Sequence, residues 1–172
     1  MRQKGKIEQI LQEAREYRIH CYRRMQLADM ADDQDGNDDK GYFVQDYQQE
    51  RTTASKNAAR LLDYINIHTN ELSPKEESEL LLTAFVALNA GFRDYELSIR
   101  AVEMAEMLLP TLPDSRVKLH LLVYLYQETG YEIIQEEMDR LMEMIETKEN
   151  TTEEYRCLME LYRQMSEQCC VY

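Results

Sequence analysis

Histidine and cysteine, the side chains that most often do chemistry, are few and scattered in this 172-residue chain. Three histidines, His20, His68 and His120, fall in three separate expected helices, and none has a carboxylate or a cysteine at metal-ligand spacing. His20 and Cys21 are neighbours, but consecutive side chains on a helix point about 100° apart and cannot form a nucleophile–base pair. No glycine-rich phosphate loop, Gly-x-Ser-x-Gly elbow or His-Glu-x-x-His motif is present.

This pattern predicts a protein that is not an enzyme and that uses no cofactor and no metal ion. A small enzyme or metal protein, whose site the sequence does not reveal, stays open as an alternative.

Residues 31–41 form an acidic stretch that invites a calcium interpretation. With Gly36 at position 6 of an EF-hand loop, acidic and amide side chains fall at positions 3, 5 and 7. Position 1 is then Ala31 and position 12 is Tyr42, so the first carboxylate and the bidentate glutamate are both missing. We therefore expect residues 31–42 to be a solvated, disordered acidic loop.

The chain carries 33 acidic and 20 basic residues, a net charge of −13. This charge argues against direct binding of nucleic acid, because counterion release requires clustered Lys and Arg, and it argues equally against anionic membrane surfaces. Residues 1–30 differ, with seven basic and four acidic groups. Such a basic arm can dock on its own acidic body, pair with another copy or steer a partner; a merely solvated helix face is the alternative.

Four cysteines form no Cys-x-x-Cys pair, and the chain shows no signal-peptide pattern. We therefore expect a cytoplasmic protein with reduced thiols. The longest apolar run, residues 80–88, is interrupted by Thr83 and is far too short to span a membrane.

Capping residues, glycines and prolines divide the chain into about seven helices. The start and stop signals in the middle of the chain are Ser73-Pro74-x-Glu76 and Gly91 for one helix, Asp94 and Pro110 for the next, and Pro113-Asp114 and Gly130 for a third. The first start is a capping box, and helix-dipole stabilisation explains the further glutamates at 77 and 79. The residues expected on the buried face of the second helix are Tyr95, Ile99, Val102, Ala105, Leu108 and Leu109.

We expect residues 1–172 to form a single all-α domain. It contains a basic amphipathic helix over 1–30, the acidic loop over 31–42, a helical core over 43–147, and a C-terminal helix and tail over 148–172. Short connections predict stacked antiparallel hairpins, arranged as a tetratricopeptide-like array or as a compact helical bundle. The pattern Asp94-Tyr95, Ala105 and Pro110 resembles the second half of a tetratricopeptide unit, but the helix before it does not match the first half, so the chain contains at most one degenerate unit.

The expected helix after Pro113 mixes aromatic and charged residues with leucines. Tyr124, Tyr126 and Glu128 interleave with a leucine-rich run, and tyrosine is enriched at interface hot spots. This helix is therefore either central in the fold or covered by a partner, and we favour the central position.

Four segments carry a resemblance to a known family. They are Glu77-Ser78-Glu79-Leu80-Leu81-Leu82, then Leu88-Asn89-Ala90 with Asp94, then Leu112-Pro113-x-Ser115-x-x-Lys118, and finally Leu121-Leu122-x-Tyr124-x-Tyr126-x-Glu128. Over residues 73–146 the chain resembles the UpxZ family, small helical proteins encoded at bacterial capsular polysaccharide loci.

The resemblance implies a regulator that antagonises NusG-like transcription antitermination factors, so that one capsule locus dominates. An acidic helical protein suits this role, because it can occupy a basic surface on the antiterminator. We expect a protein partner and name Asn89, Tyr124, Tyr126 and Glu128 as its contacts. A generic tetratricopeptide-like adaptor with another protein partner is the alternative, and the oligomeric state is left open.

Overall fold

The computed structural model describes residues 2–32, 40–146, 156, 159–160 and 163. These residues form α-helices and one 3-10 turn, with no strand among them, which confirms the all-α prediction. The elements are α1 (Arg2–Asp32), α2 (Lys40–His68), α3 (Pro74–Ala90), α4 (Tyr95–Leu108), η1 (Leu109–Thr111), α5 (Arg116–Thr129) and α6 (Glu132–Glu146). Most of the expected acidic loop and C-terminal helix lies outside the described residues.

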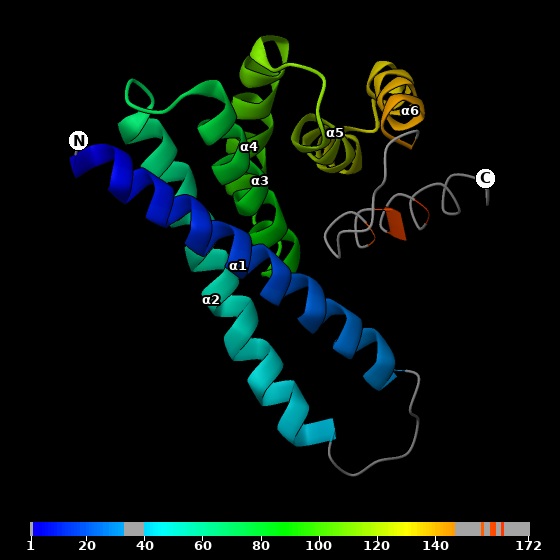
Figure 1. Ribbon diagram of the computed structural model, residues 1–172. Helices are drawn as coiled ribbons and strands as arrows, with labels where there is room; N and C mark the ends of the chain where they lie inside the picture. Colours follow the sequence, from blue (N-terminus) through cyan, green and yellow to red (C-terminus); the bar gives the residue numbers. More distant parts are fainter. Residues whose placement is uncertain (1, 33–39, 147–155, 157–158, 161–162, 164–172) are drawn as a thin grey trace.

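Helix α3 is the centre of the molecule. It contacts α1, α2, α4 and α5, and all ten of its residues from 78 to 87 are buried (Figure 1). A helix that is mostly apolar around its whole circumference is stable only when neighbours cover every side. The neighbouring helices provide this cover, since Leu80, Leu81 and Leu82 are all buried. The small residues Ala84 and Ala87 let the surrounding helices approach closely.

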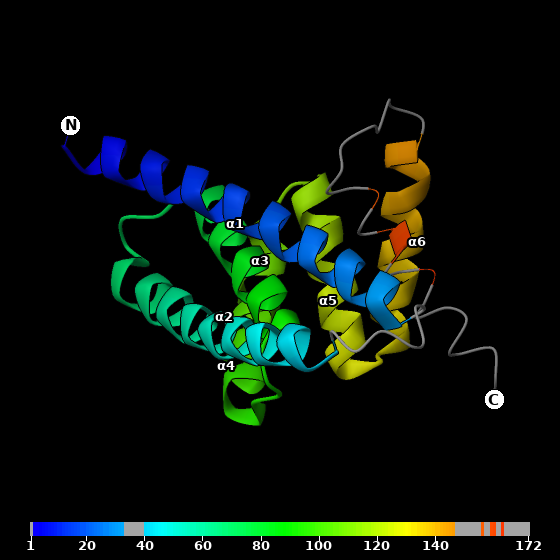
Figure 2. The ribbon, with the colours of Figure 1, turned by 90° about the horizontal axis from the view of Figure 1, so that it is seen from below.

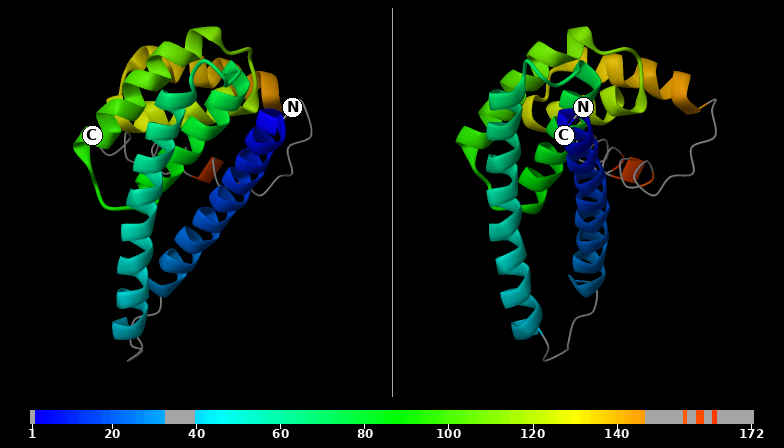
Figure 3. Two further views of the ribbon diagram at one scale, coloured as in Figure 1. Left: turned by 90° about the vertical axis from the view of Figure 1, so that its left-hand side faces the viewer. Right: turned by 60° about the vertical axis from the view of Figure 1, so that its left-hand side comes forward.

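Helices α1 and α2 form a long pair of 31 and 29 residues. Their joined ends project beyond the body made by α3–α6 (Figure 3), and there Arg24 Nε donates to Glu50 Oε1 at 2.7 Å. Seen from below, α1 lies across α3 and α5 (Figure 2). The basic arm therefore docks on its own chain. These helices are about twice as long as α3–α6, so equal repeats of a tetratricopeptide array are not confirmed.

The predicted signals at both ends of α3 are confirmed. The Ser73 N–H donates to Glu76 Oε1 at 2.9 Å and the Glu76 N–H donates to Ser73 Oγ at 3.2 Å, which completes the capping box. Gly91 follows α3 where α2 approaches, and a Cβ atom there would clash with Ser55 Oγ. Gly130 ends α5 at φ 68°, the left-handed conformation that favours glycine.

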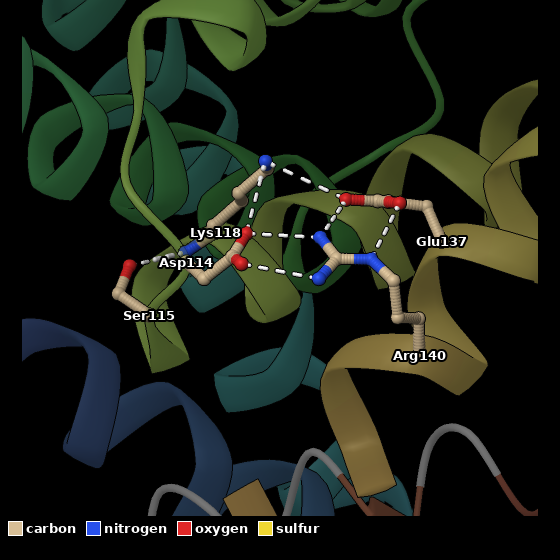
Figure 4. A network of polar contacts seen from close by, with 5 residues as sticks. All are labelled: Asp114, Ser115, Lys118, Glu137 and Arg140. Atoms are coloured by element: carbon tan, nitrogen blue, oxygen red, sulfur yellow. Dashed lines mark hydrogen bonds and ion pairs between the residues drawn. The ribbon is translucent and has the colours of Figure 1, made fainter. Parts of the chain in front are cut away.

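The predicted start of α5 at Pro113-Asp114 is wrong by two residues. The N-cap is Ser115, whose Oγ accepts from the Lys118 N–H at 3.3 Å. Asp114 is engaged elsewhere, because its two carboxylate oxygens accept from Arg140 of α6 at 3.0 and 3.1 Å. Lys118 and Glu137 complete this ion-pair network, which ties the start of α5 to α6 (Figure 4).

The expected buried face of α4 is also partly wrong. Tyr95 and Ile99 are 68% and 58% exposed, and the buried residues of α4 are Ala101, Ala105 and Leu108. Helix α4 packs against α2, α3 and α5 with Ala101 and Ala105 among its buried residues, and the larger residues Tyr95 and Ile99 remain on the outside. Their exposure creates a partly apolar surface on α4.

Candidate functional site

The outward side of α4 is a continuous helical face. Its exposed residues are Tyr95, Glu96, Ile99, Glu103, Glu106 and Met107, here called the α4 outer face. At 3.6 residues per turn, these six positions fall within a sector of about 120°, opposite the buried alanines. They form one surface because helical spacing brings them to the same side.

Half of the α4 outer face is large and apolar, and half is acidic. Met107 is 81% exposed, in addition to Tyr95 and Ile99. Isolated exposed apolar residues are ordinary, whereas these three lie on one side of a single helix. Three glutamates and no basic residue share the face, so it carries negative charge.

Helix α2 extends this surface. The Arg100 guanidinium donates to Asp63 Oδ1 at 2.8 Å, which fixes α4 beside the C-terminal part of α2. One helical turn beyond Asp63 lies Ile67, whose side chain is 74% exposed. A partner that covers α4 therefore has a further apolar contact available next to it.

Aromatic rings at the start of α4 are held by cations. The Arg51 guanidinium lies 4.7 Å from the centroid of the Phe92 ring, and the Arg93 guanidinium lies 5.0 Å from that of Tyr95. Cation–π contacts of this kind restrict the rings without covering them. Tyrosine and arginine are enriched among interface hot spots, so this end of the face has the composition of a binding site.

Tyr124, one of the four predicted contacts, lies in the core instead. It is 2% exposed, its ring stacks on Phe85 with centroids 6.0 Å apart, and its hydroxyl lies 3.3 Å from that of Tyr22. The reason is the central position of α5, in which residues 119–125 are all buried. The structure therefore contradicts Tyr124 as a direct contact and gives it a packing role.

The other three predicted contacts reach the surface. Tyr126 is half-buried, and its hydroxyl lies 3.5 Å from Gln135 Oε1, whereas Asn89 and Glu128 are exposed. Asn89 lies near the C-terminal end of α3, and Glu128 lies near the C-terminal end of α5. Partner contact by these residues stays a prediction.

The titratable residues considered from the sequence are dispersed. His20 Nε2 lies 3.9 Å from Glu50 Oε1, His68 Nδ1 lies 3.2 Å from Glu71 Oε2, and His120 is buried between α3 and α5. Burial raises the pKa of the Cys21 thiol, which makes it a poor nucleophile. Among the described residues, no three His, Cys, Asp or Glu side chains are grouped to hold a metal ion.

None of the described helices combines the length and the apolar character needed to cross a membrane. The α4 outer face, and not a group of titratable residues, is therefore the surface on which a functional interpretation can be built.

Comparison with known proteins gives one similarity. No family model matches the sequence, and no curated protein matches it. The chain is similar to the crystal structure of the transcription anti-terminator antagonist UpxZ from Bacteroides uniformis ATCC 8492, with 21% sequence identity and a TM-score of 0.48. The match covers 70% of this chain and 92% of that one. The partial resemblance to UpxZ predicted from the motifs is thereby confirmed.

Proposed function

We propose that this protein is a non-enzymatic regulator that binds a protein partner through the α4 outer face. The observation that carries the proposal is the composition of that face, three large apolar and three acidic residues on one side of a short helix. Such a face gains free energy when apolar area is covered, and its glutamates select among the surfaces that can cover it.

The composition of the α4 outer face indicates what kind of surface its partner must have. A complementary surface is apolar in its centre and basic at its edge, as on proteins that also contact nucleic acid. A net charge of −13 speeds the encounter with such a protein by electrostatic steering. The motifs that resemble the UpxZ family suggest the class, a NusG-like transcription antitermination factor. The regulator would antagonise it by occupying the basic surface that it otherwise offers to RNA, DNA or polymerase.

The other function classes fit this face less well. A generic adaptor is expected to present an apolar, tyrosine-lined surface without acidic residues, whereas Glu96, Glu103 and Glu106 lie between the apolar residues of α4. The same glutamates are repelled by anionic lipid headgroups. These observations support a basic protein partner over an adaptor ligand or a membrane.

The test is a binding titration with a purified NusG-like antiterminator from the native host. Replacing Glu96, Glu103 and Glu106 by Gln removes three charges and keeps the side-chain shape. Exposed charges contribute about 0.2–1 kcal/mol each, so the triple variant is expected to bind roughly tenfold more weakly and with less dependence on salt. Calorimetry or biolayer interferometry measures both effects.

A matched control carries the same charge change on α6, where Glu132, Glu136 and Glu143 are also exposed. Replacing these three by Gln is expected to leave the affinity within about twofold, apart from a general loss of steering. Equal weakening by both triple variants would contradict the α4 outer face as the contact. Failure of the unchanged protein to bind any antiterminator would contradict the partner class.

A further inference from the structure

The surface that α4 shares with α2 is held together at two levels. Ser55 Oγ of α2 accepts from the Phe92 N–H at 2.9 Å, just before α4 begins. Farther along both helices, Asp63 Oδ1 accepts from Arg100 at 2.8 Å. The two helices therefore lie side by side and run in the same direction (Figure 1). Their outward sides form one surface, of which the α4 outer face is one half.

The outward side of α2 is basic and apolar. Lys56, Arg60 and Ile67, here called the α2 stripe, are all exposed. At 3.6 residues per turn they fall within a sector of about 40°, opposite the buried Ala58 and Ile65. No carboxylate among the described residues forms an ion pair with Lys56 or Arg60. Two positive charges therefore stand beside the acidic α4 outer face.

Negative charges of α4 lie on the side nearer to α2. In helical projection Glu96 and Glu103 each fall within about 60° of Arg100, the residue that reaches α2. Neither glutamate forms an ion pair with a residue that the structure describes. Met107 lies on the same side and is 81% exposed. The shared surface thus has two rows, one with two positive and one with two negative charges, and each row includes a large apolar residue.

We propose that a second copy of this chain covers this surface. A two-fold axis along the boundary between α2 and α4 places the α2 stripe of each copy over the acidic row of the other. Two cations from each copy then face two carboxylates of its partner, and Ile67, Ile99 and Met107 of both copies are removed from water. A two-fold axis across the rows would instead set like charges against each other, so the charges select one arrangement.

Charge complementarity favours a second copy over other occupants of the whole surface. A basic partner of the α4 outer face matches Glu96 and Glu103 but gains nothing from Lys56 and Arg60, and an acidic partner has the reverse problem. A surface that carries both rows at the same spacing matches both, and the chain itself presents such a surface.

The dimer covers the α4 outer face and so competes with the protein partner for it. By mass action the dimer stores the chain at high concentration, and dilution or a tightly binding partner draws it into monomers. This regulatory consequence rests on the proposed function, whereas the dimer itself does not.

The experiment is analytical ultracentrifugation of the full chain over a range of protein and salt concentrations. A monomer–dimer equilibrium that salt weakens is expected, because the contacts include exposed charges. Two variants reverse one row each: Lys56→Glu with Arg60→Glu, and Glu96→Lys with Glu103→Lys. Each is expected to weaken dimerisation by about tenfold or more, since like charges then meet at both symmetry-related contacts.

Mixing the two variants tests the pairing of the rows. In the mixed dimer one contact carries the original charges and the other carries both reversals, so dimerisation is expected to recover. The matched control, Glu132→Lys with Glu136→Lys on α6, changes the net charge as the second variant does and is expected to leave dimerisation within about twofold. A chain that is monomeric at every concentration, no recovery on mixing, or equal weakening by the control would overturn the proposal.

A binding titration separates the dimer from the proposed function. The variant with Lys56→Glu and Arg60→Glu keeps the α4 outer face and is expected to be monomeric. It should bind the NusG-like antiterminator more tightly than the unchanged chain does, by a factor that grows with chain concentration. A factor that does not change with concentration would overturn the competition. A charge-dependent dimer that binds no antiterminator would contradict the proposed function alone, and a monomer that binds it would contradict the dimer alone.

Discussion

The neighbouring helices α4 and α5 each have 14 residues, yet the fold uses them in opposite ways. In α5 seven consecutive residues, 119–125, are buried, and they include a histidine and a tyrosine. In α4 the buried residues are two alanines and a terminal leucine, while a tyrosine, an isoleucine and a methionine stay exposed. The same kinds of side chain therefore build the core in one helix and a surface in the next.

This difference teaches that apolar content alone does not distinguish a scaffold helix from a binding helix. Helix α5 is packed by α3, α4 and α6, so the side chains of residues 119–125 have no access to a partner. Helix α4 has two alanines among its buried residues and leaves Tyr95, Ile99 and Met107 exposed. We therefore propose that α5 serves mainly the stability of the fold and that α4 serves recognition.

The largest expected effect is that of truncating a tyrosine on each helix. Tyr124→Ala removes a buried ring stacked on Phe85, which costs about 3–5 kcal/mol of unfolding free energy. Tyr95→Ala removes a ring that is 68% exposed, and the change is expected within about 0.5 kcal/mol. Urea unfolding followed by circular dichroism measures both.

Comparable losses of unfolding free energy in the two variants would contradict the distinction between the helices. Tyr95 would then contribute to the stability of the fold as much as Tyr124 does. Small losses in both would show that Tyr124 is replaceable in the core.

The second expected effect is a pH dependence of the unfolding free energy that arises from the buried His120 of α5. His120 has a pKa of about 3 in the folded chain and of 6.5 when unperturbed, so the unfolded chain binds a proton that the folded chain excludes between these values. The stability that this histidine contributes is present above pH 6.5 and is lost as the pH falls, by at most about 1.4 kcal/mol per pH unit.

Replacing His120 by Leu is therefore expected to flatten the dependence of the unfolding free energy on pH between 7 and 5. The groups that face His120 from α1, α3 and α5 are Arg15, Arg18, Glu79 and Arg116, and they remain in the variant. His20→Leu, at a side chain that is 60% exposed, is the control and should keep the original slope. Identical slopes in both variants would contradict a buried, neutral His120.

The smallest expected effect on the unfolding free energy is that of removing the N-cap of α4 or of α5. Asp94 accepts from the Leu97 N–H at 3.1 Å at the start of α4, and Ser115 accepts from the Lys118 N–H at 3.3 Å at the start of α5. Alanine at either position costs about 1 kcal/mol. Hydrogen exchange is expected to show fraying confined to α4 for Asp94→Ala, but faster exchange in α3 and α6 as well for Ser115→Ala. The opposite pattern would reverse the assigned roles.

The sequence predicts the helices well, because their ends depend on local chemistry. Ser73, Glu76, Asp94 and Gly130 act within one turn of themselves, so their roles can be read without knowing the fold. The start of α5 was missed because the Asp114 carboxylate is engaged by Arg140, 26 residues away, and this leaves the cap to Ser115.

The candidate surface is less predictable, because exposure depends on neighbours that periodicity does not identify. The apolar spacing of α4 reveals an apolar face, but it does not reveal that Ala101 and Ala105 are buried whereas Tyr95 and Ile99 are exposed.

The central claim, that the α4 outer face binds a NusG-like antiterminator, is tested most directly by affinity capture from the native host with two matched variants. Ile99 and Ile133 are exposed isoleucines, 58% on α4 and 75% on α6, and each is replaced by Arg. Quantitative mass spectrometry is predicted to find the antiterminator with the unchanged protein and with Ile133→Arg, and to find it depleted with Ile99→Arg. Equal recovery by all three, or recovery of unrelated proteins with no antiterminator or polymerase component, would contradict the claim.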